Sequence, residues 1–448
     1  MFPAFAAQEA EKESSPVKNH LQNHFKLYGF IRNYFIFDSR ESVSGTGDLF
    51  YYLPKDVSMN EAGTEDLNAA SSFRFLALTS RLGVDVSGFQ LGNVAFGAKI
   101  EGDFYAGLSN SSNADAGKYF PGNTKISGTA TARLRQAYAT ITWKELDGDP
   151  HDYIGLKVGQ AWHPMAADMP HIFSLEAGAP FGPFSRTPQV TMDATLDDTW
   201  VFSLSALWQM QYQSAGPVGA SSLYMKYGKT PELYAGVTYK SKGFLMRLGA
   251  DLLSIKPRYF GEEKLQGGKA NKFRVSDRKT SMLYYLYAQY SYKTFAVKAK
   301  TTFGEGGEHM NLMSGYAKVG ENSDGSWEYA SLSNSSSWLS LSYGKKWQGV
   351  LFLGYVVNYG LMDEASAPLA KGDVYFCGNG FSNINQMYRI NPQLIYNIGK
   401  MNIGLEYQWT SVQYGEYDGG NLNAYGLADK NLHWVGNHRV NMMVKFNF

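Results

Sequence analysis

The sequence predicts an all-β protein, a transmembrane antiparallel β-barrel of about sixteen strands with short periplasmic turns and long extracellular loops. Three observations predict this fold. Runs of about ten to fifteen alternating apolar and polar residues recur along the chain. The breaks between the runs alternate between short and long, and the last run continues to the final residue, Phe448.

The composition excludes several other classes of protein. Lys and Arg number 41 and Asp and Glu number 40, so no basic surplus indicates a nucleic-acid partner. Hydrophobic residues make up 44% of the chain, yet no apolar run approaches the roughly 20 residues that a membrane helix needs. The 31 tyrosines and 47 glycines suit a chain of strands and turns. The single cysteine, Cys377, allows no internal disulfide.

The first residues predict an exported chain. The letters AFAA at 4–7 resemble the small-residue cleavage site of a secretory signal, so residues 1–7 are expected to be the remainder of a signal peptide. The apolar stretch is too short for a whole signal, which leaves coincidence as the alternative. Residues 8–24 are polar and predict a short periplasmic tail. The barrel domain is then expected to span residues 25–448, with a lumen that only loops narrow.

The alternating runs are the predicted strands, with an uncertainty of one hairpin around 186–240. The runs are residues 25–40, 71–88, 93–106, 129–144, 151–162, 186–196, 199–213, 232–240, 243–258, 280–293, 294–305, 336–346, 348–363, 387–399, 401–415 and 437–448.

The breaks between the runs distinguish a membrane barrel from a soluble sandwich. The short breaks follow residue 87, occupy 147–152, 196–198 and 240–243, and lie near Lys293, Trp347 and Lys400. The long breaks are 41–70, 107–128, 163–185, 214–231, 259–279, 306–335, 364–386 and 416–436. Outer-membrane barrels place all long loops at one end in this way, whereas a soluble sandwich has no reason to do so.

The last run, HRVNMMVKFNF at 438–448, alternates with a period of two up to its terminal aromatic residue. The end of a chain usually frays, so a terminal strand is stable only when both of its edges are paired with other strands. In a closed barrel the last strand pairs with the first, so no edge remains. We therefore expect this strand to close the barrel and to be the signal that the barrel-assembly machinery recognises. The alternative for this stretch alone is an edge strand of a soluble sandwich.

The two faces of the runs differ in charge. In 93–106, for example, Ile100 and Phe104 share one face, and Glu101 and Asp103 share the other. Charge facing hydrocarbon costs about 2–4 kcal/mol at the midplane, so the charged face should line a watery lumen. Aromatic residues near strand ends are expected in the interfacial girdles. They are Tyr28, Trp143, Trp162, Trp347, Tyr359 and Trp409.

The cations of the predicted lumen outnumber its acids. The cations are Arg32, Arg81, Arg133, Arg135, Lys157, Arg247, Lys298, Lys300 and Arg389, and the acids are Asp85, Glu101, Asp103, Asp193, Asp251 and Glu406. Arginine stays charged and can bind a carboxylate through two nitrogen atoms. The surplus predicts attraction of anions, with Arg81, Arg133 and Arg135 in a cationic wall and Arg32 close by. The alternative is that these charges pair with one another.

The third long loop, 163–185, contains seven large apolar residues and few charges. They are Met165, Met169, Ile172, Phe173, Leu175, Phe181 and Phe184. A loop in water has no use for so many apolar side chains, so we expect this loop to fold into the lumen and narrow it. A subunit contact is the alternative.

Signals for catalysis and metal binding are weak. No nucleophile-elbow, zinc-protease or phosphate-loop pattern occurs. His163 and His171 are eight residues apart and have no third ligand nearby in sequence, so no metal is predicted there. Asp147, Asp149 and Asp152 are interpreted as solvated turn residues. We therefore expect no enzymatic activity and no cofactor, with a barrel-embedded hydrolase as the least favoured alternative.

Four segments together resemble the DcaP-like porins of Gram-negative outer membranes, in the form typical of Bacteroidetes. The segments are KLYGFIRNYFIFDSRE (26–41), LRQAYATI (134–141), GLKVGQAWHPM (155–165) and PFSRTPQV (183–190). The resemblance is spread over most of the barrel, and its strong motifs lie in the first half. It implies a sixteen-stranded trimeric channel with an inward loop and an arginine-lined constriction that favours anionic solutes such as dicarboxylates.

The resemblance also implies which residues act in the channel. The matching basic positions are Arg32, Arg133, Arg135 and Arg186. The helical periplasmic extension of some members has no counterpart here, so a tether is not implied. The function to expect is an outer-membrane porin, a homotrimer in contact with lipid, through which small polar and preferably anionic solutes diffuse. The alternative is an outer-membrane structural or interaction barrel whose loops seal the lumen.

Overall fold

The computed structural model describes residues 24–45, 50–77, 79–106, 130–264, 270–377 and 382–448. The predicted signal remainder, 1–7, and nearly all of the predicted tail, 8–24, lie outside these residues. Within them, no helix is both long and apolar enough to cross a membrane.

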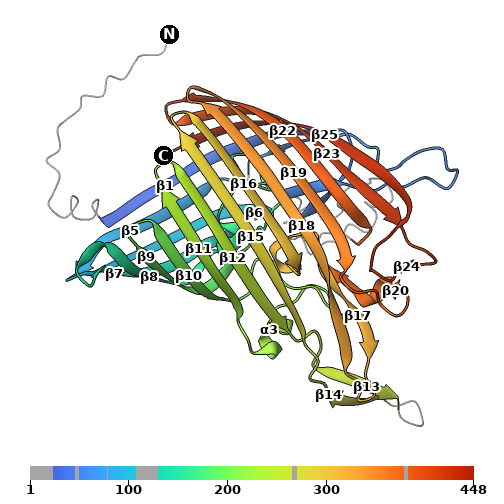
Figure 1. Cartoon of the computed structure of the whole chain (residues 1–448). Coiled ribbons are helices and arrows are strands. Elements are labelled where there is room, and N and C mark those ends of the chain that lie inside the picture. The colour runs from blue at the N-terminus through green and yellow to red at the C-terminus, as the bar shows by residue number, and fades with distance from the viewer. Residues whose placement is uncertain (1–23, 46–49, 78, 107–129, 265–269, 378–381) are drawn as a thin grey trace.

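The described chain forms a closed antiparallel β-barrel of 16 strands, as predicted (Figure 1). Each strand pairs with the next wall strand in sequence. The wall consists of β1 (Phe25–Asp38), β4 (Ser72–Leu76) with β5 (Arg81–Leu91) as one strand, β6 (Val94–Ala106), β7 (Ala130–Leu146), β8 (Asp149–Trp162), β9 (Arg186–Leu196), β10 (Trp200–Leu207), β11 (Glu232–Ser241), β12 (Phe244–Ile255), β15 (Lys279–Tyr292), β16 (Phe295–Glu305), β18 (Trp327–Gly344), β19 (Trp347–Leu361), β22 (Ile384–Ile398), β23 (Met401–Glu416) and β25 (Lys430–Asn447).

Shorter elements lie in the connections between wall strands. They are β2 (Ser42–Gly45), β3 (Phe50–Pro54), η1 (Pro164–Ala166), α3 (Leu223–Gly228), β13 (Phe260–Lys264), β14 (Ala270–Arg274), η2 (Glu308–Met310), β17 (Gly315–Glu321), β20 (Leu369–Ala370), η3 (Lys371–Asp373), β21 (Val374–Phe376) and β24 (Asn421–Leu422). Figure 1 shows the short turns along the upper left rim, near the C-terminus. The elements of the long connections, among them β13, β14, β17, β20 and β24, lie at the lower right.

The pairing of β25 with β1 closes the barrel, which confirms the interpretation of the last run. The register extends from Phe30 opposite Asn447 to Asp38 opposite Arg439. Beyond the strand, the Phe448 N–H donates to the Gly29 carbonyl over 3.1 Å, and the Gly29 N–H donates back over 3.3 Å. A Cβ at Gly29 would lie 2.6 Å from the Phe448 ring, so the terminal ring packs directly on this glycine.

Several strand boundaries differ from the predicted ones. The predicted strand 71–88 is interrupted between β4 and β5, and the predicted strand 199–213 leaves the wall after Leu207. The strand predicted at 336–346 begins at Trp327, inside the predicted loop 306–335. The first residues of β18, 327–331, pair with β17. Its serine-rich middle, 333–337, lacks an apolar face and pairs with β16 and β19. Tertiary pairing therefore decides what local alternation does not show.

The outward face of the wall is apolar and the inward face is polar, as the alternation predicts. Ile100 is 62% exposed and Leu405 is 55% exposed, whereas their neighbours Glu101 and Glu406 are 4% and 0% exposed. Exposed apolar side chains recur on all sides of the barrel, on β1, β5, β10, β12, β19 and β25 among others. A surface of this kind is stable in lipid and not in water. The barrel is therefore a transmembrane barrel.

The predicted aromatic girdle is correct in part. Trp143, Trp347 and Tyr359 are exposed on the outer surface. Tyr28 and Trp162 were wrongly assigned to the girdle. The Tyr28 hydroxyl donates to Glu101 over 3.0 Å, and the Trp162 ring packs against Phe184 at 5.1 Å between centroids. Glu101 and Phe184 both lie inside the barrel, so the side chains of Tyr28 and Trp162 face the lumen and not the membrane interface.

Removal of Phe446–Phe448 should prevent assembly, because it deletes the pairs of these residues with Ile31, Phe30 and Gly29 and opens the seam. Most of the truncated protein should lose the heat-modifiable gel mobility of a folded barrel. Phe260→Ala, in the exposed β13–β14 hairpin, is the control and should assemble normally. A truncated protein that still shows the mobility shift in the outer membrane would contradict the assignment of this strand.

Candidate functional site

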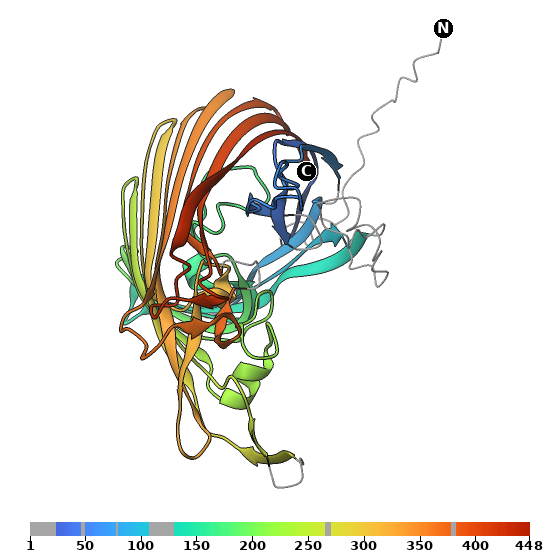
Figure 2. The same cartoon turned by 90° about the vertical axis from the view of Figure 1, so that its right-hand side faces the viewer.

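Residues 163–185, named the inner loop here, lie inside the barrel. The His163 N–H donates to the Ser185 carbonyl over 3.1 Å, which closes the neck of the loop. Met165 and Phe181 are 0% exposed. Figure 2 shows the green loop within the ring of strands. The inward fold predicted from the apolar residues is confirmed, and the alternative of a subunit contact is wrong because the barrel's own wall covers these side chains.

Two glycines of the wall make room for phenylalanines of the inner loop. A Cβ at Gly354 of β19 would lie 2.5 Å from the Phe181 ring, and a Cβ at Gly404 of β23 would lie 2.7 Å from the Phe173 ring. Any larger side chain at either glycine would displace the ring. In addition, the Tyr34 hydroxyl of β1 donates to the Phe173 carbonyl. The loop is thus held in fixed depressions of the wall.

Four of the predicted lumen cations hold the inner loop. Lys300 Nζ donates to the Met165 and Asp168 carbonyls over 2.7 and 2.6 Å. Arg247 pairs with the Asp168 carboxylate at 2.8 Å, and Lys298 Nζ donates to the Met169 carbonyl over 3.3 Å. The remaining cation, Arg389, pairs with Glu176 of the loop at 3.1 Å. Arg389 also donates to the Thr410 hydroxyl and to the Tyr52 carbonyl. Solute contact by these four residues remains a prediction.

His171 of the inner loop is neutral at physiological pH. Burial, and then the neighbouring Lys298, lower the pKa of His171 to about 4. Its Nδ1 lies 3.0 Å from the Ser342 hydroxyl. Burial therefore disfavours a positive charge on His171.

Two further loop segments fold inward, and neither was predicted. The β3 segment places Phe50 against Phe184, with 5.9 Å between ring centroids. The segment 306–314 buries Met310 and Leu312 completely, and the Phe184 N–H donates to the Met310 carbonyl over 2.8 Å. The signal that identified the inner loop, large apolar residues inside a polar connection, is present in both segments. It would have found them.

Four arginines line one side of a cavity of about 220 Å³ between the wall and the inner loop. Arg32 comes from β1, Arg81 from β5, and Arg133 and Arg135 from β7. The facing side consists of apolar side chains of the inner loop and its neighbours, namely Phe50, Trp162, Met169, Ile172, Phe173, Leu175, Ala177 and Phe184. The structure therefore brings together four residues that are up to about 100 positions apart in the sequence.

Two carboxylates of β6 are shared among three of these arginines. Arg133 binds Asp103 through two nitrogens at 2.9 and 3.0 Å. Arg135 bridges Glu101 at 2.8 Å and Asp103 at 2.7 Å, and Arg81 lies 3.6 Å from Glu101. The alternative that lumen charges pair with one another is thus correct for part of the set. Four guanidiniums against two carboxylates still leave an excess of two positive charges.

Among the predicted lumen arginines, Arg32 and Arg186 differ from the others in having no salt bridge to a carboxylate within the described residues. Arg32 Nε donates to the Thr79 hydroxyl over 3.2 Å, and its guanidinium lies 4.8 Å from the Phe30 ring centroid. Arg186 is 2% exposed, lies 4.8 Å from the Trp162 ring and donates to Gln211 over 2.9 Å. Because no carboxylate pairs with them, these two guanidiniums add their full positive charge to the potential in the lumen.

A second cavity of about 330 Å³ lies on the other side of Trp162. It is lined by charges of both signs, among them Lys157, Asp193, Lys240 and Arg247. Lys157 lies 5.7 Å from the Tyr138 ring. Of the predicted site residues, Lys157 and Arg247 thus line this cavity of mixed charge, and the four arginines named above line the other.

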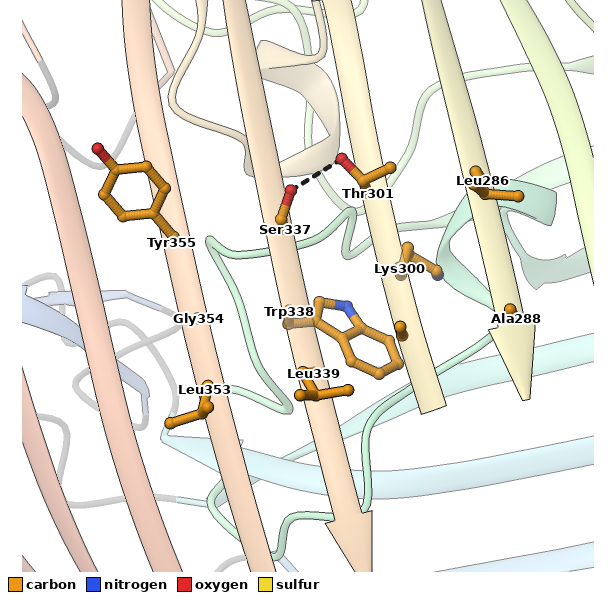
Figure 3. A pocket seen from close by; sticks show the side chains of 11 residues that line it. Leu286, Ala288, Lys300, Thr301, Ser337, Trp338, Leu339, Leu353, Gly354 and Tyr355 are labelled. Atoms are coloured by element: carbon orange, nitrogen blue, oxygen red, sulfur yellow. Dashed lines mark hydrogen bonds between the residues drawn. The ribbon is translucent and has the colours of Figure 1, made fainter. Parts of the chain in front are cut away.

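A groove of about 420 Å³ lies on the wall formed by β15, β16, β18 and β19 (Figure 3). Leu286, Leu339 and Leu353 surround it, and the small side chain of Ala288 leaves the space. Leu286 and Leu353 belong to the exposed apolar face, opposite the buried Tyr287 and Phe352. The groove faces lipid and is not a site for a polar solute.

Two groups of side chains among the described residues have the spacing of metal ligands. Asp149, Asp152 and Asp197 meet at the short turns, where Asp152 accepts a hydrogen bond from the Asp197 N–H over 2.8 Å, in keeping with their interpretation as turn residues. The other group joins His163, Glu232, Asp251 and His309, all buried. The pairing considered in the sequence, His163 with His171, does not form.

Comparisons with known proteins identify the fold. No family model matches the chain, and no curated protein matches it. Among solved structures, the outer-membrane channel DcaP of Acinetobacter baumannii is similar with 18% identity and a TM-score of 0.58, over 95% of this chain and 97% of that chain. An anion-selective porin from Comamonas acidovorans is similar with 10% identity and a TM-score of 0.51, over 95% and 99%. The chain thus has the fold of outer-membrane porins along nearly its whole length.

Deleting residues 168–180 should raise single-channel conductance, because it removes the apolar side of the arginine cavity and frees Arg247 and Arg389 from their loop partners. The measurement is the current through a planar bilayer. The matched control deletes 262–272 at the β13–β14 hairpin, outside the lumen, and should leave conductance unchanged. An assembled 168–180 deletion with native conductance would show that the inner loop does not limit the current.

Proposed function

We propose that this protein is a passive diffusion channel of the Gram-negative outer membrane for small polar solutes, with a preference for anionic ones such as dicarboxylates. The single observation that carries the proposal is the cavity in which Arg32, Arg81, Arg133 and Arg135 face the inner loop. The porin fold supports the channel role. One barrel with this fold is an anion-selective porin, which supports the same preference here.

The arginine cavity can select anions without trapping them. At an effective dielectric constant near 20, one charge about 6 Å from a solute carboxylate contributes on the order of 3 kcal/mol before desolvation and salt screening. Asp103 and Glu101 neutralise part of the wall, so the net attraction is weaker than four free arginines would give. A weak attraction suits diffusion, because a solute has to leave as readily as it enters.

The proposal includes a homotrimer in contact with lipid and passage through the barrel-assembly machinery. The apolar outer face supports lipid contact. The trimer rests on the resemblance of the sequence to trimeric porins. Current steps that come in groups of three would support it.

A second candidate function is a structural or interaction barrel with a sealed lumen. The observation in its favour is the extent of loop packing inside the barrel. Phe50, Met165, Phe181, Met310 and Leu312 from three separate connections are all 5% exposed or less and belong to one apolar cluster. The absence of stepwise current from assembled protein would favour this candidate over the channel.

The double substitution Arg32→Gln and Arg81→Gln should shift the zero-current potential toward cation preference. If salt screening leaves about 1.4 kcal/mol of the attraction, the anion-to-cation permeability ratio should fall about tenfold. Asp103→Asn should shift the potential the other way, because it frees Arg133 and Arg135 of a shared carboxylate. The measurement is the reversal potential across a salt gradient.

The control for these variants is Lys371→Gln, an exposed loop lysine, which should leave the potential unchanged. Equal selectivity in the native protein and in both lumen variants would mean that the arginines only stabilise the barrel wall and do not select ions.

A further inference from the structure

A buried group of two histidines and two carboxylates joins four distant segments of the chain. His163 follows β8 directly, Glu232 begins β11, Asp251 lies in β12, and His309 lies in η2. All four side chains are 2% exposed or less. One nitrogen or oxygen atom from each lies within 4.8 Å of those of the other three. The group lies where the inner loop begins and where the inward segment 306–314 meets the wall.

The spacing of the donor atoms suits a small divalent cation. Zn²⁺ ligands with bonds of roughly 2.0–2.2 Å lie about 3.3 Å apart around a tetrahedron. In the group, His309 Nε2 lies 2.6 Å and His163 Nε2 lies 3.0 Å from Glu232 Oε1, and His163 Nε2 lies 3.6 Å from Asp251 Oδ1. The three distances lie on both sides of the ligand spacing. The shortest, between His309 Nε2 and Glu232 Oε1, has to widen by about 0.7 Å through side-chain rotation for an ion to fit between the two atoms.

The charges and hydrogen bonds of the group are incompletely satisfied by protein atoms. Among the described residues, Glu232 and Asp251 have ion pairs with the two histidines alone and none with lysine or arginine. Glu232 Oε2, Asp251 Oδ1 and His309 Nδ1 are buried and have no hydrogen-bond partner there. Two buried carboxylates are stable when a compensating positive charge lies between them. A divalent cation supplies that charge and takes up the unpaired oxygens.

Hydrogen bonding distinguishes the role of His163 from that of His309. The Met165 N–H donates to His163 Nδ1 over 3.2 Å, so the proton of the neutral His163 ring is on Nε2 and faces Glu232. His163 therefore orients the Glu232 carboxylate as an outer partner. Among the described residues no donor faces His309 Nδ1, so the ring proton can lie on Nδ1. The lone pair of His309 Nε2, which now lies 2.6 Å from Glu232 Oε1, can then bind a metal.

We propose that His309, Glu232 and Asp251 bind one divalent transition-metal ion, with His163 as the positioning residue of Glu232. One imidazole nitrogen and two carboxylates suit Zn²⁺ or Mn²⁺, and the nitrogen ligand disfavours Ca²⁺ and Mg²⁺. The ion joins strands β11 and β12 and the segment 306–314, and His163 links the start of the inner loop to the site through Glu232. Its role is to fix the inward segments, a function separate from solute passage.

The test uses the full-length, tag-free barrel, stripped with a chelator and titrated with Zn²⁺ alone. Bound metal is measured by elemental mass spectrometry after gel filtration. We expect about one ion per chain in the native protein, and none in His309→Gln or Glu232→Gln. His163→Gln should bind the ion about 10–100-fold more weakly, because it removes only the outer partner. The matched control is His171→Gln, another inner-loop histidine, which should bind as the native protein does.

Heat-modifiable gel mobility shows which variants remain folded, and two independent ligand variants keep the test decisive if one fails to fold. A native barrel that binds no Zn²⁺ would overturn the proposal and leave the group as a network of ion pairs. Equal binding by the native protein, His309→Gln and Glu232→Gln would overturn it as well. The test is independent of conductance, so it separates failure of this site from failure of the proposed channel.

Discussion

The structure depends on the pairing of its first strand with its last. In the hydrocarbon of a bilayer no water is available to bond an exposed N–H or C=O group, so every strand edge has to be covered by another strand. The β1–β25 ladder meets this requirement, and the mutual hydrogen bonds of Gly29 and Phe448 extend it to the final residue. Closure then fixes which face of each strand is inside. The charges on the inward face of the strands become lumen charges as a consequence of one seam.

The lumen is not a simple water-filled tube, because part of it contains an apolar core. Three connections bring apolar side chains inward, and the inner loop is held by both depressions and charges of the wall. Phe181 occupies the depression at Gly354, while Lys300 holds the carbonyls of Met165 and Asp168. A buried ammonium group is costly unless it is hydrogen-bonded, so Lys300 keeps these carbonyl partners where water is excluded. The inner loop is therefore part of the folded structure and not a mobile cover.

The arginines of the wall serve stability and electrostatics at once. Arg133 and Arg135 share Asp103, which keeps two like charges close together without an uncompensated repulsion. Arg32 instead rests on the faces of Phe30 and Tyr34, which favour a cation but add no negative charge. Shared carboxylates and aromatic faces together allow several guanidiniums to lie close to one another while the wall keeps a net positive charge. A wall with one acid for each base would be equally stable and would carry no preference for anions.

The sequence by itself determined the barrel, the direction of its faces and the inward course of the inner loop. These follow from a period of two, from break lengths and from seven apolar residues in one connection, which are local properties of the chain. The start of β18 at Trp327 could not be predicted from local alternation. Residues 327–331 pair with β17, and the serines at 333–337, which show no apolar face, form a strand between β16 and β19. The sharing of Asp103 by two arginines depends on the register between β6 and β7, which no single strand encodes. The meeting of His163 with His309 was decided by the tertiary structure alone, since two loops had to fold into the same lumen before the residues could approach.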